Sequence, residues 1–132
     1  MTLTAPFELA ASTAPAATAA TAAADAAWQP VCPLDVLEPL WAEAALVHGE
    51  QVALVRLPSD EVLAVSHRDP QSEAYVMARG IVGSRNGIPT LASPLHKQVY
   101  ELSTGRCLTD PDLRIRTFPV RVRDRVVEVL AA

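Results

Sequence analysis

The chain has 132 residues, of which 50% are hydrophobic and 20% charged, enough for one globular domain with a modest core and too few for two. Its formal net charge of -4 hides an uneven distribution, because residues 1–55 contain no Lys or Arg at all. The arginines of the second half alternate with apolar residues, as on the solvent face of a strand, and only Phe118 offers a ring for stacking on bases. This pattern argues against a nucleic-acid-binding protein.

The first 27 residues differ in composition from the rest of the chain. They include 13 Ala and 5 Thr, and only Glu8 and Asp25 carry charge. Such a segment has no large side chains to bury and cannot offset the entropy lost on ordering. We therefore expect a flexible tail over residues 1–27, followed by one domain over residues 28–132.

The same segment bears on localisation. No Lys or Arg precedes Arg56, whereas a secretory signal has a basic start and a mitochondrial presequence is rich in arginine. A run of about 18 strongly apolar residues, as a transmembrane helix requires, is also missing. The sequence predicts a cytoplasmic protein that does not interact with a membrane.

From Trp28 onward, short apolar runs alternate with turn residues, which is typical of an all-β domain. Residues 51–57 and 61–65 flank a short polar loop and predict a hairpin. Asn86-Gly87 predicts a tight turn because both residues accept positive φ. Two β-branched arms around residues 123–125 predict a further hairpin.

Helical patterns are few. Residues 33–46 offer one or two helical turns, interrupted at Pro39, and residues 72–80 offer a short helical stretch that ends at Gly80. The fold class that follows is an antiparallel β-sandwich built from short strands and hairpins, with at most one or two short helical turns.

Catalytic motifs are absent from the sequence. The three histidines, His48, His67 and His96, belong to no nucleophile elbow, phosphate-binding loop, dinucleotide fingerprint or zinc-protease motif. No hydrolase can be assembled from these residues.

Two further pairs invite a metal or redox interpretation. Cys32 and Cys107 lie far apart and outside any Cys-x-x-Cys spacing, so we expect core thiols, with a disulfide left open. Asp110 and Asp112 bracket Pro111 and have a spacing that suits a divalent ion. A turn whose carboxylates bond their own backbone is the favoured reading of that pair.

Two stretches carry a resemblance to a known family. VSHRDPQSEA (residues 65–74) and SPLHKQVYELSTG (residues 93–105) resemble the two cluster loops of Rieske iron-sulfur proteins. In that family the loops supply Cys-x-His and Cys-x-x-His, so that two thiolates bind one iron and two imidazoles the other. The corresponding positions here are Asp69, Gln71, Ser93 and His96. Three of the four ligands are missing, which implies a Rieske-like domain without its cluster.

Four separated phrases narrow the resemblance: RGIVG (79–83), SPLHKQ (93–98), LSTGRCLTDP (102–111) and PVRV (119–122). Together they resemble the small subunit of the assimilatory NAD(P)H-dependent nitrite reductase, over about four-fifths of the chain. The Ala-Thr segment before Trp28 has no counterpart in that family.

This resemblance implies an accessory role in an oxidoreductase complex. In the family, the large subunit carries FAD, an iron-sulfur cluster and siroheme, and reduces nitrite to ammonium in nitrate assimilation. This chain is then a non-catalytic small subunit with no cofactor of its own, and its partner is the large subunit.

The docking surface is left open between two possibilities. One is the loop tip that meets redox partners in true Rieske domains, where polar residues stand here: Arg68, Asp69, Gln71, His96 and Lys97. The other is a sheet face, or the edge near Val126–Val129.

Two alternative functions belong to other classes. A Rieske-type ferredoxin that carries a two-iron cluster to an oxygenase requires the four ligands that this sequence lacks. A free-standing β-sandwich binding module requires no partner subunit.

Overall fold

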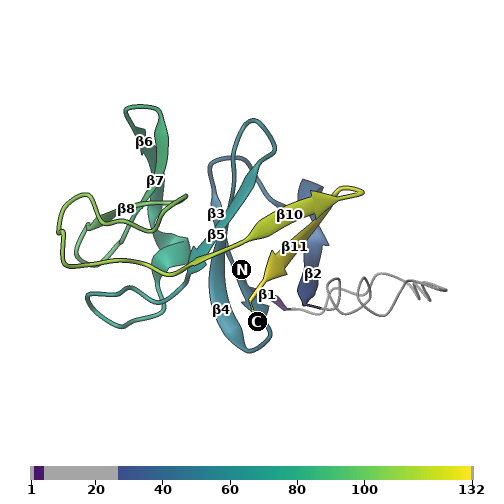
Figure 1. Ribbon diagram of the computed structural model, residues 1–132, viewed down its shortest axis with the longest axis horizontal. Helices are drawn as coiled ribbons and strands as arrows, with labels where there is room; N and C mark the ends of the chain where they lie inside the picture. Colours follow the sequence, from purple (N-terminus) through teal and green to yellow (C-terminus); the bar gives the residue numbers. More distant parts are fainter. Residues whose placement is uncertain (1, 5–26, 132) are drawn as a thin grey trace.

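The computed structural model describes residues 2–4 and 27–131, which form strands and two 3-10 helices. The strands make three sheets, and Figure 1 shows the five-stranded sheet between the two three-stranded ones. The elements are β1 (Thr2–Thr4), β2 (Trp28–Pro33), η1 (Leu34–Val36), β3 (Ala42–Val47), β4 (Glu50–Arg56), β5 (Val62–Ser66), η2 (Met77–Arg79), β6 (Ile81–Arg85), β7 (Ile88–Ala92), β8 (Val99–Glu101), β9 (Thr117–Phe118), β10 (Val120–Arg123) and β11 (Val126–Leu130).

The central sheet has the order β1-β3-β4-β5-β9, and β4 lies at its middle, antiparallel to β3 and β5. Successive side chains of a strand point to opposite faces. Val52 and Leu54 therefore pack into one apolar cluster, while Ala53 and Val55 pack into another. All four are fully buried, which explains the unbroken apolar run of this strand.

Each apolar cluster joins the central sheet to one of the outer sheets. The first cluster packs the central sheet against the sheet β10-β11-β2 through Val31, Val127 and Val129. The second cluster includes Leu91 and Tyr100 of the sheet β6-β7-β8. The loops between β5 and β6 and those around β8 lie at this second end of the molecule (Figure 1).

The predicted all-β class and the predicted turns are confirmed. Residues 51–57 and 61–65 lie in the β4-β5 hairpin. Asn86 and Gly87 have φ values of 54° and 79° between β6 and β7. In the last hairpin, Asp124 and Arg125 take positive φ, 52° and 60°, between β10 and β11. The turn residues in the sequence therefore predict the positions of three hairpins: β4-β5, β6-β7 and β10-β11.

The helical expectations are confirmed only in part. Within residues 33–46, a single 3-10 turn occurs at Leu34–Val36, and Ala42–Val47 is strand β3 rather than helix. The six ladder pairs that β3 forms with β4 outweigh the helix propensity of its three alanines. The short helical stretch before Gly80 is present as η2.

The N-terminal segment is described only at Thr2–Thr4. These residues form β1, which pairs in parallel with residues 44–46 of β3. Residues 5–26 lie outside the described residues, so the division into a tail (1–27) and a domain (28–132) stays a prediction. Within the described ranges, no helix has the length and hydrophobicity needed to span a bilayer.

Candidate functional site

The two loops that resemble Rieske cluster loops lie together at one end of the molecule, which we call the tip, defined as residues 67–76 and 93–98. The first loop follows β5, and the second connects β7 to β8. Two backbone bonds close the second loop: Ser93 N–H donates to Gln98 O (2.9 Å) and Lys97 N–H to Ser93 O (3.0 Å). A hydrogen bond between Ser93 and Asp69, 24 positions apart in sequence, joins the two loops.

The two positions that hold cysteines in Rieske proteins carry a hydrogen-bonded pair. Ser93 Oγ donates to Asp69 Oδ2 at 2.5 Å, and both residues are buried. The other carboxylate oxygen of Asp69 accepts from Gln71 N–H at 2.9 Å. A serine and a carboxylate therefore tie the two loops together where two thiolates would bind iron.

The Asp69 carboxylate is ionised despite its burial. Burial raises the pKa of this carboxyl, but hydrogen bonds from Ser93, Gln71 and Ser72 outweigh it and hold the pKa below its usual value. The negative charge is stabilised by donors fixed in the loop, as the charged form of a buried acid requires. Asp69 is therefore a structural residue of the tip, unlike the surface contact expected from the sequence.

The two positions of the imidazole ligands are not linked to each other. Gln71 Oε1 accepts from Gln98 Nε2 at 2.8 Å, while His96 is exposed at the surface of the second loop. Arg68 and Lys97 are also exposed, and Arg68 pairs with Glu73 at 3.3 Å. The tip therefore presents Arg68, Gln71, His96 and Lys97 around a buried Asp69-Ser93 pair.

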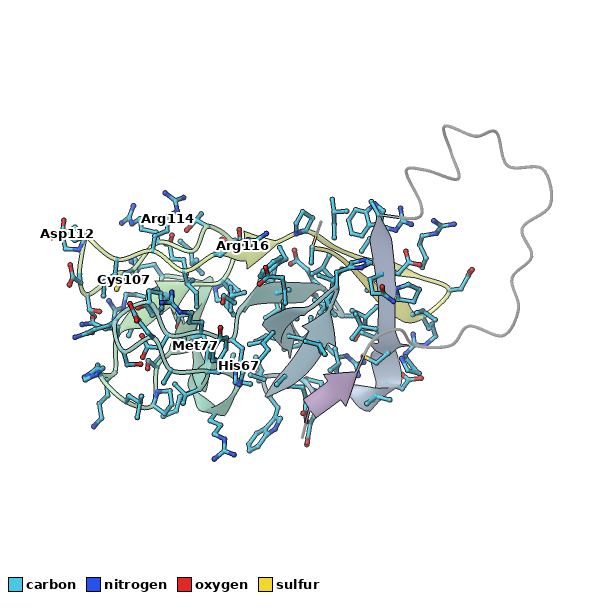
Figure 2. The ribbon with its side chains drawn as sticks, turned by 90° about the horizontal axis from the view of Figure 1, so that it is seen from below. His67, Met77, Cys107, Asp112, Arg114 and Arg116 are labelled. Carbon is cyan, nitrogen blue, oxygen red and sulfur yellow. The ribbon has the colours of Figure 1, made fainter. Side chains whose placement is uncertain are left out.

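Sequence reasoning missed the polar contacts that the tip residue Gln98 makes with the following loop. Gln98 Oε1 accepts from Thr109 Oγ1, and Cys107 Sγ lies 3.3 Å from the same hydroxyl. Figure 2 shows Cys107 toward the end of the molecule that carries Asp112. Tyr100 is fully buried nearby, its hydroxyl has no hydrogen-bond partner in the described part of the chain, and burial raises its pKa well above the ordinary value. The sequence gives no sign of these contacts.

The remaining candidates have structural explanations. Cys32 and Cys107 are free and buried, as expected for core thiols, and burial raises the pKa of Cys32 to about 11. Asp112 N–H donates to Asp110 Oδ1 at 2.9 Å, which confirms the turn. His67 Nδ1 accepts from Ala78 N–H at 3.0 Å, and Figure 2 shows His67 beside Met77. Burial, and then the charge of Arg79, lower the His67 pKa.

The residues of the tip do not fit a two-iron cluster. Such a cluster needs two thiolates and two imidazoles, whereas the four corresponding positions hold a carboxylate, a hydroxyl, an amide and one imidazole. The carboxylate and the hydroxyl are also engaged with each other. Among the described residues, no group of three or more His, Cys, Asp or Glu is arranged to hold a metal ion.

A first prediction follows from this donor set. The purified protein is expected to contain fewer than about 0.1 iron atoms per chain, because each missing thiolate removes a ligand that iron requires. Elemental analysis and a visible absorption spectrum measure this directly. Stoichiometric iron with the absorption bands of a two-iron cluster would contradict the donor-set argument.

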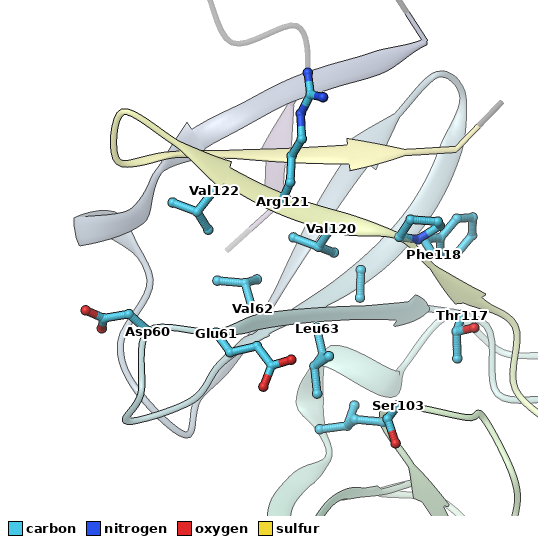
Figure 3. A pocket seen from close by; sticks show the side chains of 13 residues that line it. Asp60, Glu61, Val62, Leu63, Ser103, Thr117, Phe118, Val120, Arg121 and Val122 are labelled. Atoms are coloured by element: carbon cyan, nitrogen blue, oxygen red, sulfur yellow. The ribbon is translucent and has the colours of Figure 1, made fainter. Parts of the chain in front are cut away.

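A groove of about 560 Å³ lies away from the tip, between β5 and β10 (Figure 3). Its walls include Leu63, Phe118 and Val120, and Asp60 and Glu61 lie at one end. Asp60 is paired with Arg56 at 2.7 Å. The residues that line the groove include no histidine or cysteine.

The comparisons with known proteins agree with this geometry. The family model described as Rieske-like [2Fe-2S] domain matches residues 27–130. The nitrite reductase (NADH) small subunit of Salmonella typhimurium is 41% identical over 103 residues, which cover 77% of this chain and 95% of that protein. The solution structure of the Escherichia coli protein NirD is 38% identical and superimposes with a TM-score of 0.71, covering 77% of this chain and 94% of that one.

Two further similarities concern proteins of other kinds. The nitrite reductase [NAD(P)H] large subunit of Klebsiella oxytoca is 36% identical over 102 residues, which cover 77% of this chain and only 11% of that protein. The ferredoxin of carbazole 1,9a-dioxygenase from Nocardioides aromaticivorans is 27% identical with a TM-score of 0.71, covering 80% of this chain and 98% of that one.

The full-length match to a small subunit is stronger in sequence than the match to the ferredoxin, and the polar pair at the tip differs from a cluster-binding site. The chain therefore belongs to the Rieske-like domain family and, within it, to the family of nitrite reductase (NADH) small subunits.

Proposed function

We propose that this protein is the accessory small subunit of a cytoplasmic NAD(P)H nitrite reductase, which reduces nitrite to ammonium. The chain aligns with nearly the whole length of a small subunit of that name, and its residues supply no catalytic constellation of their own. Its role is then to support a catalytic partner.

The observation that carries the proposal is the similarity to a segment of a large subunit. In the Klebsiella oxytoca protein, a region like this domain forms 11% of a much longer chain named as a nitrite reductase large subunit. A domain that is covalently joined to the large chain in one relative works beside that chain. The same arrangement, as a separate subunit, is proposed here.

The redox chemistry is assigned to the partner. FAD, an iron-sulfur cluster and siroheme are proposed to lie on the large subunit, as the family resemblance implies, and the tip of this chain lacks three of the four ligands of a two-iron cluster. The buried Asp69-Ser93 pair stabilises the loops without metal, which suits a domain that shapes or stabilises a complex.

The exposed part of the tip is proposed to contact the large subunit. Arg68, Gln71, His96 and Lys97 are all exposed there, whereas Asp69 acts from inside by fixing both loops. Polar and charged residues of this kind are typical of the rim of an interface, where they influence the association rate more than the affinity.

Co-expression with the large subunit tests the proposal. Wild-type protein is expected to co-purify with the large subunit and to increase nitrite-dependent NAD(P)H oxidation at least several-fold over the large subunit alone. The double variant Arg68→Glu, Lys97→Glu is expected to slow association about tenfold at low salt, because it reverses two rim charges.

A matched control is the double variant Arg123→Glu, Arg125→Glu, which makes the same charge change at the β10-β11 hairpin. Figure 1 shows this hairpin at the opposite end of the molecule from the loops around β8. Wild-type protein that neither binds the large subunit nor alters its activity would overturn the proposed function. Equal association rates for both double variants would overturn only the contact at the tip.

A ferredoxin function is the second candidate, because the similarity to the carbazole dioxygenase ferredoxin extends over 98% of that protein. Electron transfer by such a protein depends on the two-iron cluster. Asp69, Gln71 and Ser93 occupy three of the four ligand positions, so the iron measurement described above separates the two functions.

A further inference from the structure

Four of the large apolar side chains that remain exposed gather on one face. Leu40, Trp41, Tyr75 and Ile81 are 52%, 61%, 53% and 74% exposed. They line two adjoining hollows, of about 200 and 510 Å³, that share Trp41 and Arg79 as common walls. We call these residues the Trp41 patch: Leu40, Trp41, Tyr75, Arg79 and Ile81.

The backbone holds this patch in place from two sides. Leu40 has a φ of 61°, an unfavourable value for a leucine, and its N–H donates to Arg56 O at 2.8 Å. On the other side, a Cβ at Gly80 would lie 2.2 Å from Ala92 O, so only glycine allows η2 and β7 to approach so closely. The patch is therefore built on constrained backbone rather than on a loose loop.

The composition of the patch matches the centre of a protein interface. Trp, Tyr and Arg are the residues most enriched among those that dominate binding energies. Arg79 is exposed, and its guanidinium makes no hydrogen bond or ion pair within the described ranges of the chain. A free guanidinium between Trp41 and Ile81 requires a carboxylate from whatever covers the patch, because a buried unpaired charge is costly.

The patch also borders the tip. Tyr75 pairs with Arg68 in an isolated β-bridge, and its ring lies 6.3 Å from the ring of His67. An apolar surface beside a polar one has the arrangement of an interface core with its rim. The tip shares Tyr75 with the patch, and its exposed polar residues supply the rim.

We infer that the Trp41 patch is the central contact with the large subunit, which covers it with an apolar surface and a carboxylate that pairs with Arg79. This inference rests on the proposed function. The Klebsiella oxytoca large subunit supports this occupant, because there a similar domain is part of the same polypeptide as the rest of the large chain.

Affinity measurements on the co-expressed complex test the inference. Trp41→Ala and Ile81→Ala are each expected to weaken binding of the large subunit at least tenfold, and Arg79→Glu at least as much. Val36→Ala and Val122→Ala are matched controls, since these valines are 49% and 37% exposed and lie outside the patch, and they are expected to change affinity less than twofold. Thermal unfolding of each free variant verifies that it is folded.

A fluorine label gives a second measurement that needs no mutation. The chain has two tryptophans, and Trp28 lies under Arg121 in the sheet β10-β11-β2, with the guanidinium carbon 4.5 Å from the ring centroid. With 5-fluorotryptophan incorporated, the fluorine resonance of Trp41 is expected to shift on binding the large subunit, whereas that of Trp28 stays in place.

The possible outcomes distinguish a failure of the inferred patch contact from a failure of the proposed function. If wild-type protein binds the large subunit but the patch variants bind equally well and the Trp41 resonance does not shift, the inference is wrong and the proposed function stands. If wild-type protein does not bind the large subunit, the proposed function fails. If the chain alone is a dimer in light scattering and Trp41→Ala makes it monomeric, a second copy covers the patch and the inference is overturned.

Discussion

Replacing Gly105 with alanine is expected to lower the free energy of unfolding by about 3 kcal/mol or more. Gly105 has a φ of 80°, and a Cβ there would lie 2.0 Å from Ile115 O and 3.1 Å from Thr117 Cγ2. Ile115 N–H also donates to Gly105 O at 2.8 Å, so the two backbones cannot separate without losing that bond. Denaturant unfolding followed by circular dichroism measures the loss.

Gly87→Ala is the matched control for this substitution. Gly87 has nearly the same φ, 79°, but no atom within 4 Å of the position of a Cβ. Its replacement by alanine is expected to lower the free energy of unfolding by about 1 kcal/mol, because only the left-handed backbone conformation is unfavourable there. Equal losses for the two variants would show that steric overlap at Gly105 is relieved, and would contradict the prediction.

Replacing Asp69 with alanine is expected to lower the free energy of unfolding by about 3 kcal/mol. The substitution leaves the Ser93 hydroxyl and the Gln71 N–H without their acceptor, and Ser93 is 2% exposed. The two loops of the tip lose the buried side-chain bond between them and keep the exposed bond between Gln98 and Gln71. Gln71→Ala is the control. It removes one exposed side-chain hydrogen bond, to Gln98, and is expected to lower the free energy of unfolding by less than about 1 kcal/mol.

The effect of Asp69 also depends on pH. Its pKa is lower in the folded protein than in the unfolded chain, so its stabilisation is fully present above the unfolded value of about 4 and is lost as the pH falls through the folded value. The stability difference between wild type and Asp69→Asn is therefore expected to narrow below about pH 4. A difference that is constant from pH 7 to pH 2 would contradict this assignment.

Local chemistry along the chain predicts much of the fold. Asn86-Gly87 and the residues around Asp124 predict turns because they accept positive φ, and they adopt it. The apolar runs of β4 and β5 and the polar loop between them predict a hairpin. These signals depend on neighbouring residues only, so they can be read without the tertiary structure.

The sequence also predicts which chemistry is missing from the tip. A ligand set is a matter of residue types at fixed positions, and Asp69, Gln71 and Ser93 are not ligands for a two-iron cluster. The prediction of helical turns over residues 33–46 is wrong from Ala42 onward, because Ala42–Val47 has no local feature that favours a strand. Its pairing with β4 decides the conformation.

Residue identity alone therefore determines the β class, the tight turns and the lost ligand set of this protein. Only the tertiary structure decides that Asp69 bonds Ser93 inside the tip, and that Trp41, Tyr75 and Ile81 meet around Arg79 on one face. The physical reason is distance along the chain. Burial and contact between residues tens of positions apart depend on how the sheets pack, which no local pattern encodes.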